Sequence, residues 1–143
     1  MALGQFEKSI DCNNTALEIS KAIGKRGQCD GTAYAQLGMA YNSLGQNEKS
    51  LHFFKKAIQV FKKTGWVEGQ GVHFCSLGAL YDDLAQYNES ISCLQEALRI
   101  FKTYDSQLGE LACYINLGMV FKPICQYMRH QLKFLKKHLL FPH

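Results

Sequence analysis

Residues 34–41 read YAQLGMAY, and this arrangement of an aromatic residue, a Leu-Gly pair and a second aromatic residue returns twice along the chain. It recurs as FCSLGALY at 74–81 and as YINLGMVF at 114–121, at intervals of 40 residues. The four shared positions are spaced i, i+3, i+4 and i+7, which places them on one face of an α-helix. The sequence therefore predicts three copies of one amphipathic helix.

A second amphipathic helix follows each of the first two copies. Apolar residues share one helical face between 51 and 61, and the same pattern returns between 91 and 101. We expect Gly38 and Ala57 to lie where the two helices cross, because larger side chains would hold the backbones apart. A turn at 44–47 joins the helices, with Gly45 suited to the left-handed conformation after a helix. Each 40-residue unit is thus predicted to be a helix pair.

The N-terminal segment matches the second half of such a unit. Residues 3–9 (LGQFEKS) correspond to 44–50 (LGQNEKS), which places the start of the chain at the turn before a second helix. We expect this helix to extend from Gln5 to Ile23, without the helix that would precede it in a full unit. Its apolar residues span more than one face, so some of them should remain exposed: Phe6, Ile10, Leu17, Ile19 and Ile23.

The C-terminal segment leaves the pattern at Pro123. Proline cannot continue a helix without losing a hydrogen bond, so the first helix of the third repeat is predicted to end at or before Lys122. A turn is predicted at 124–127. Residues 128–143 are then predicted to form a basic amphipathic helix. Its apolar stripe is Met128, Leu132, Leu135 and Leu139, and its basic face is Arg129, His130, Lys133, Lys136 and Lys137.

This pattern resembles the tetratricopeptide repeat (TPR) family. The matching residues of the first full copy are Tyr34, Leu37, Gly38, Tyr41, Ser50, Phe54 and Ala57. Those of the second are Phe74, Leu77, Gly78, Tyr81, Ser90, Leu94 and Ala97. The sequence departs from the family in having serine where a small alanine is usual and a period of 40 instead of 34. A 40-residue period is similar to that of kinesin light chains and Pins-related adaptors, in which the second helix and the following loop are longer.

The resemblance implies an all-α, helix-turn-helix solenoid that forms a superhelix. Within residues 1–127 it gives a half repeat at 1–27, full repeats at 31–70 and 71–110, and a partial repeat at 111–127. HEAT repeats share the period and remain an alternative, although they lack the Leu-Gly-x-x-Tyr core. WD40 blades have a similar period but are excluded by the helical spacing and the absence of Trp-Asp.

Composition limits the cellular setting of the protein. The chain has 143 residues, of which 47% are apolar, and a formal net charge of +4. No run of about 18 apolar residues is present, and the N-terminus lacks the basic and apolar regions of a secretory signal. The six cysteines include no Cys-x-x-Cys pair, so free thiols in a reducing, cytoplasmic environment are expected.

The sequence offers no arrangement of residues suited to catalysis. Asp82 and Asp83 are adjacent, so a helix would point them about 100° apart. The five histidines lack His-x-x-x-His spacing, and the glycines of 65–71 lack the strand and the Lys-Ser/Thr of a phosphate loop. We predict no enzymatic activity, no cofactor and no metal, and we interpret 65–71 as a flexible connection between repeats. Trp66 is interpreted as a plug between successive repeats or as an exposed contact for a partner.

The resemblance implies that partners bind in the concave groove lined by the first helix of each repeat. Chaperone-binding TPRs clamp a carboxylate there with lysine and asparagine, but here Ala35, Met39, Cys75 and Ala79 replace those residues, so that clamp is absent. The groove is predicted to be apolar and adaptable, although Met39 and Met119 would also suit simple packing against neighbouring helices. The transferred groove positions are Ala35, Gln36, Met39, Asn42, Ser43, Cys75, Ser76, Ala79, Asp82, Asp83, Ile115, Asn116, Met119 and Lys122.

We therefore expect a non-catalytic scaffold that holds a peptide or helix of another protein. One alternative is a module whose basic C-terminal helix contacts nucleic acid or anionic membrane, although no aromatic or glycine residues accompany the charge as they do in RNA sites. Another is that the chain is a fragment or truncated isoform of a longer scaffold, because both ends break inside a repeat. Self-association through the exposed ends of the array is a further expectation.

Overall fold

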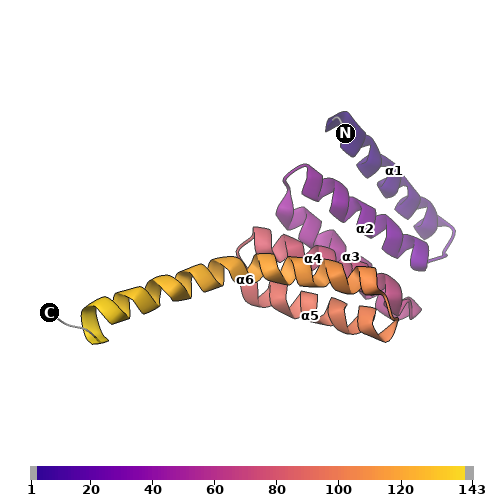
Figure 1. Cartoon of the computed structure of the whole chain (residues 1–143). Coiled ribbons are helices and arrows are strands. Elements are labelled where there is room, and N and C mark those ends of the chain that lie inside the picture. The colour runs from indigo at the N-terminus through magenta and orange to yellow at the C-terminus, as the bar shows by residue number, and fades with distance from the viewer. Residues whose placement is uncertain (1–2, 141–143) are drawn as a thin grey trace.

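The computed structural model describes residues 3–140, and their side chains as far as His138. Within this part of the chain there is no strand, and six α-helices are followed by a short π-helical segment (Figure 1). The all-α fold class predicted from the sequence is confirmed. The helices are α1 (Leu3–Ala22), α2 (Gln28–Ser43), α3 (Asn47–Thr64), α4 (Val67–Asp83), α5 (Tyr87–Thr103) and α6 (Gln107–Leu135), and the π-helical segment η1 is Lys136–Leu140.

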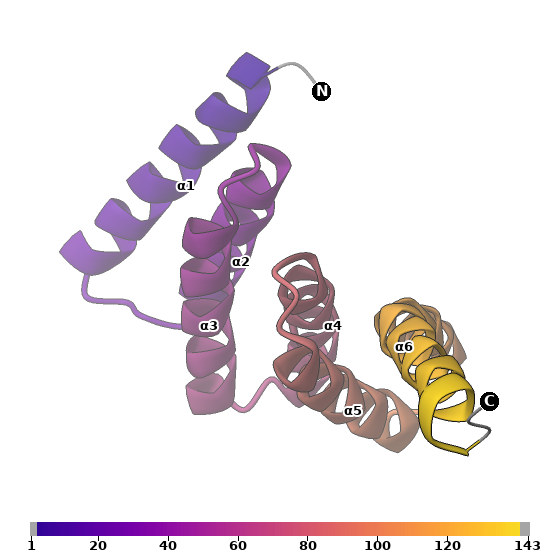
Figure 2. The same ribbon diagram turned by 90° about the vertical axis from the view of Figure 1, so that its left-hand side faces the viewer.

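The helices form antiparallel pairs that stack along the chain. The most extensive contacts join α2 to α3 and α4 to α5, while α3 packs on α4 and α5 packs on α6 (Figures 1 and 2). The first helix, α1, lies against α2, as the second helix of one repeat lies against the first helix of the next. Each helix thus contacts mainly its immediate neighbours, which is the arrangement of a solenoid.

The Leu-Gly positions lie at the helix crossings, as the spacing predicts. A Cβ atom added to Gly38 would come 3.0 Å from the ring of Phe54, and one added to Gly78 would come 2.5 Å from Cγ of Leu94. Both leucines of the motif, Leu37 and Leu77, are buried. Glycine is therefore required at these positions because the second helix of each pair occupies the space of a side chain.

Serine in place of the usual alanine has a structural role at the same crossings. The Ser50 hydroxyl donates a hydrogen bond to the carbonyl of Gly38, and Ser90 donates one to Gly78, each over 2.6 Å. Both serines are completely buried, so these hydrogen bonds form away from water. A fully enclosed serine hydroxyl without a partner would be costly, and the nearby carbonyl provides that partner.

The turns within the two full helix pairs share one backbone conformation. Gly45 has a φ of 75°, as predicted, and Ala85 adopts the same left-handed region with a φ of 57°. Glycine adopts this region without strain, whereas for alanine the left-handed conformation is unfavourable by roughly 1–2 kcal/mol. The second pair therefore carries a strained turn that the packing of α4 on α5 overcomes.

The prediction of a flexible connection at 65–71 is wrong. Helix α3 ends at Thr64, Gly65 takes the left-handed conformation with a φ of 76°, and α4 already begins at Val67. Gly69 and Gly71 are buried within α4. These glycines make room for neighbouring side chains, which is a packing requirement and not a source of mobility.

Trp66 packs between the two full helix pairs. Its ring meets the ring of Phe61 from α3 edge-on, with 4.8 Å between their centroids. On the other side it covers Gly69, where an added Cβ would approach the indole ring to 2.3 Å. The interpretation of Trp66 as a plug between successive repeats agrees with this geometry, although 37% of the residue remains exposed.

The prediction that Pro123 ends the first helix of the third repeat is also wrong. Helix α6 continues through Pro123 to Leu135, and no turn forms at 124–127. A hairpin there would place His130 where Ser50 and Ser90 are fully enclosed, and Lys137 where Ala57 and Ala97 are fully enclosed. Burying those two cationic or titratable side chains costs more than the roughly 3 kcal/mol of a proline inside a helix.

The expected basic helix is therefore an extension of α6 and not a separate element. It projects away from the array and changes direction as it leaves it (Figure 1). Every residue from Cys125 to His138 is exposed, so this segment does not dock on the other helices. Residues 141–143, which belong to the predicted 128–143 helix, lie outside the described residues, as do residues 1 and 2 of the half repeat.

Among the described residues no second helix packs back on α6, so the third copy of the motif is uncovered. Nothing lies within 4 Å of a Cβ added to Gly118, in contrast to Gly38 and Gly78. Tyr114 and Phe121, the aromatic residues of this copy, are 53% and 43% exposed. The same motif is thus buried twice and left open once.

Helix α1 is the least buried of the array helices. Only Asn13 is buried in it, where the equivalent residue of α3 is Phe54, and the Asn13 side chain donates to the carbonyl of Ser9 within the same helix. Ile19 and Ile23 are more than half exposed, as expected from their spread over several faces.

We expect hydrogen exchange to be fast across α1 and slow across residues 77–98. The reason is that α1 is held by partly buried side chains on one side only, whereas the α4–α5 crossing is closed by fully buried residues. Exchange monitored by mass spectrometry on the intact chain measures both segments at once. Equal protection of the two would show that α1 is packed as firmly as the centre of the array.

Candidate partner-binding groove

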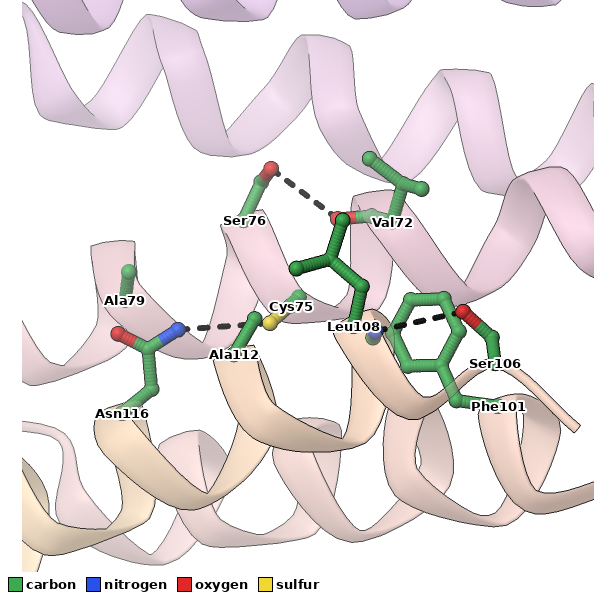
Figure 3. Close-up of a pocket in the computed structure, with 10 residues that line it drawn as sticks. Val72, Cys75, Ser76, Ala79, Phe101, Ser106, Leu108, Ala112 and Asn116 are labelled. Atoms are coloured by element: carbon green, nitrogen blue, oxygen red, sulfur yellow. Dashed lines mark hydrogen bonds between the residues drawn. The ribbon is translucent and has the colours of Figure 1, made fainter.

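A groove of about 480 Å³, open to solvent, lies between α4 and α6 (Figure 3). One wall comes from α4 and the other from the first half of α6, with Phe101 of α5 beneath them. The side chain of Leu108 extends from α6 toward α4 (Figure 3). The residues that line the groove are Val72, Cys75, Ser76, Ala79, Phe101, Ser106, Leu108, Gly109, Ala112 and Asn116.

The few polar groups of this groove are engaged within the protein. The Asn116 amide donates a hydrogen bond to Sγ of Cys75 over 3.4 Å, and the Ser76 hydroxyl donates to the carbonyl of Val72 over 3.1 Å. Ser106 caps α6, where its hydroxyl accepts from the Gly109 amide over 3.3 Å. What the groove presents to a ligand is therefore mostly methyl, methylene and aromatic surface.

Two thiols meet at the groove. The Sγ atoms of Cys75 and Cys113 are 4.0 Å apart, and Cys113 is completely buried. Burial, and then the neighbouring Cys75, raise the pKa of the Cys113 thiol to about 12. Because the thiolate is the reactive form, Cys113 is a packing residue and not a nucleophile at neutral pH.

A second, smaller cavity of about 210 Å³ lies between α1 and α2. It combines the exposed Met39 of α2 with the partly buried Phe6 of α1. Its lining residues are Phe6, Ser9, Gln36, Met39, Ala40 and Ser43.

The structure distributes the predicted groove residues over these two places and beyond them. Four of them line the α4–α6 groove, namely Cys75, Ser76, Ala79 and Asn116. Three line the α1–α2 cavity, namely Gln36, Met39 and Ser43. Outside both lie the exposed Asn42, Asp83, Ile115, Met119 and Lys122, and the half-buried Asp82.

Two predictions about these positions need correction. Ala35 is not a surface position, because it is only 3% exposed and packs with Ala57 and Phe61 in the core. The alternative that Met39 and Met119 only pack against neighbouring helices is wrong, since they are 57% and 58% exposed. Both methionines are thus accessible, as flexible apolar side chains at binding surfaces are.

Sequence reasoning missed six lining residues: Val72, Phe101, Ser106, Leu108, Gly109 and Ala112. Val72 and Ala112 lie one helical turn before the predicted Cys75 and Asn116, so helical periodicity could have found them. Leu108 is 80% exposed and begins α6, a position that no motif marks. Phe101 was assigned to the core, where it also belongs.

The titratable residues near the groove are spread apart or enclosed in the core. Among the described residues no group of three or more His, Cys, Asp or Glu side chains could hold a metal ion. His73 is stacked on Phe61 with 5.1 Å between ring centroids, and burial lowers its pKa. Its Nδ1 atom is buried without a hydrogen-bond partner, so the imidazole is a neutral core residue. None of the described helices combines the length and the hydropathy that crossing a bilayer requires.

The comparisons with known proteins agree with the fold. Models of the tetratricopeptide repeat match residues 1–63 and 74–104. A search of curated proteins found no match. Among solved structures, the chain is similar to BtubC (BKLC) from P. vanneervenii, with a TM-score of 0.76, 19% sequence identity and 98% of this chain covered. The chain spans about 60% of the length of that structure. With two matching family models and a matching solenoid, this chain is a member of the tetratricopeptide repeat family.

Proposed function

We propose that the α4–α6 groove binds an apolar peptide or helical segment of a partner protein. TPR repeats indicate a protein–protein interaction scaffold, and the presence of this groove supports the proposal that the partner binds here. The observation that carries the proposal is the open, mostly apolar cleft of about 480 Å³. This volume falls within the roughly 300–1,000 Å³ of typical ligand clefts.

The chemistry of the groove favours one kind of segment. Apolar side chains of the partner would cover Val72, Ala79 and Ala112, which need no polar complement. One helical turn beyond Ala79, α4 carries Asp82 and Asp83, and Asp83 is exposed. A lysine or arginine next to the apolar anchors would meet these carboxylates and fix the direction of binding. We propose a cytoplasmic location for this interaction, supported by the six free cysteines of the structure.

Peptides selected on the immobilised chain from a random display library are expected to share apolar anchors. We expect Ala112→Glu to weaken their binding by roughly tenfold or more, because it places a charge among apolar contacts. Fluorescence polarisation with a labelled selected peptide measures this change. Ala112 is exposed at the groove wall, so glutamate is tolerated by the helix itself.

Two variants serve as controls for this experiment. Ala22→Glu makes the same change at an exposed site of α1 away from the groove, and it should leave binding unchanged. Replacing Lys133, Lys136 and Lys137 with glutamine should also leave it nearly intact. Equal affinity of Ala112→Glu and Ala22→Glu, with both helical by circular dichroism, would contradict the proposed site.

A further inference from the structure

The charges of this chain are divided unevenly along its length. Eleven lysine and arginine residues and twelve aspartate and glutamate residues precede residue 111, so the array is close to neutral. From residue 111 onward the chain has five lysine and arginine residues and no acidic residue. Four of the five lie in the part of α6 and η1 that projects from the array.

The projecting helix separates its apolar and basic side chains. At 100° per residue, the side chains of Tyr127, Met128, Leu132, Phe134 and Leu135 fall within an arc of about 160°. An arc of about 120° centred on the opposite side holds all four lysine and arginine residues of the segment together with His130, whereas Gln131 and His138 fall within the apolar arc. The residues of the basic arc are Arg129, His130, Lys133, Lys136 and Lys137.

The apolar face of this segment is uncovered. Tyr127 and Met128 are 66% and 63% exposed, and Leu132 and Phe134 are half exposed. No helix of the array contacts them, because the segment points away from the array (Figure 1). Large exposed apolar side chains gathered on one side of a water-exposed helix indicate an interaction site.

A binding partner of this helix should contact its apolar face and neutralise its basic face. Nucleic acid would neutralise the basic face and leave the apolar face in water. The groove of an acidic protein would bury the apolar face and leave most of the lysines pointing outward. An anionic lipid surface engages both faces, since apolar side chains enter the acyl boundary while lysine and arginine side chains extend to the phosphate headgroups.

We propose that the segment from Ile124 to His138 is an interfacial helix that lies on anionic membranes and holds the repeat array beside them. Each cationic residue near such a surface contributes about 1 kcal/mol of attraction. The absence of any acidic residue in this segment means that no repulsion offsets that attraction. Pro123 marks the junction at which the membrane-bound segment leaves the array.

The test is co-sedimentation of the full chain with phospholipid vesicles. We expect binding to phosphatidylcholine vesicles that contain about 30% phosphatidylserine, and at least roughly tenfold weaker binding to pure phosphatidylcholine. Two variants probe the two faces separately: Leu132→Gln with Leu135→Gln, and Lys133→Gln with Lys136→Gln and Lys137→Gln. Each is expected to reduce binding by roughly tenfold or more. All five positions are exposed, so the array should fold unchanged in both variants.

A matched control changes three exposed lysines at the other end of the chain to glutamine, namely Lys8 and Lys21 of α1 and Lys25 just after it. This variant has the same net charge as the lysine variant of the projecting segment and should bind vesicles nearly as well as the wild type. Equal loss in the two lysine variants would show that overall charge, and not the projecting helix, attracts lipid, and would overturn the proposal.

Three further outcomes would overturn it. The first is equal binding to charged and uncharged vesicles, and the second is full binding by the Leu132→Gln, Leu135→Gln variant. The third is an absence of vesicle binding together with salt-sensitive binding to a random-sequence RNA, which would assign the basic face to nucleic acid. None of these results bears on the α4–α6 groove, which is tested with peptides.

Discussion

Replacing Gly78 with leucine is expected to destabilise the array by about 1–3 kcal/mol or more, because the side chain has no space to enter. A single Cβ at this position would already lie 2.5 Å from Leu94, and Leu94 is completely buried and cannot withdraw. The α4 and α5 helices would have to move apart, which would also stretch the buried hydrogen bond from Ser90 to the Gly78 carbonyl.

The chain contains its own control for this experiment in Gly118. It occupies the same motif position, yet nothing lies within 4 Å of an added Cβ. Gly118→Leu should therefore be neutral or slightly stabilising, since leucine is a better helix former than glycine by somewhat under 1 kcal/mol. Urea denaturation followed by circular dichroism compares the two variants. Similar midpoints would place the crossing elsewhere and refute the repeat register. Gly69 is less suitable as a control because Trp66 covers it.

Phe61→Ala is expected to cost about 3–5 kcal/mol of stability, as large cavities in well-packed cores do. Phe61 is completely buried and joins three helices. Its ring fills the space above Gly31 of α2, stacks on His73 of α4 and meets Trp66 before α4. Truncating it removes contacts within the first full helix pair and contacts between the two pairs.

The matched change for Phe61 is Phe134→Ala in the projecting part of α6. Phe134 is 54% exposed, so its truncation should alter stability by about 0.5 kcal/mol or less. Thermal unfolding of both variants gives the comparison. An equal loss in the two would mean that α6 is packed as tightly as the array, contrary to its exposure.

Most of the repeat architecture could be read from the sequence because it rests on local constraints. The spacing of aromatic and Leu-Gly positions fixes which face of each helix is apolar. Glycine at 38 and 78 shows where two backbones meet, and Gly45 shows where the chain reverses. Such signals depend on residues a few positions apart, so one sequence is enough to interpret them.

The candidate groove was only partly predictable. Cys75, Ala79 and Asn116 follow from the family pattern, but Leu108 lines the groove only because the start of α6 lies beside α4. Ala35 was assigned to the surface on the same pattern and is buried instead, because the Phe61 ring and Ala57 close over that part of α2. Exposure at such positions depends on how neighbouring helices tilt, which no spacing records.

The sequence by itself determined the helix pairs, their 40-residue period and the glycine and serine positions at their crossings, since each follows from sterics and hydrogen bonding between nearby residues. Only the tertiary structure decided the course of α6 after Pro123. Locally, proline favours a break, but a break would bring His130 and Lys137 into positions that admit only small residues. The cost of enclosing those side chains exceeds the cost of one missing helical hydrogen bond, so the helix continues outward and leaves both of its faces in solvent.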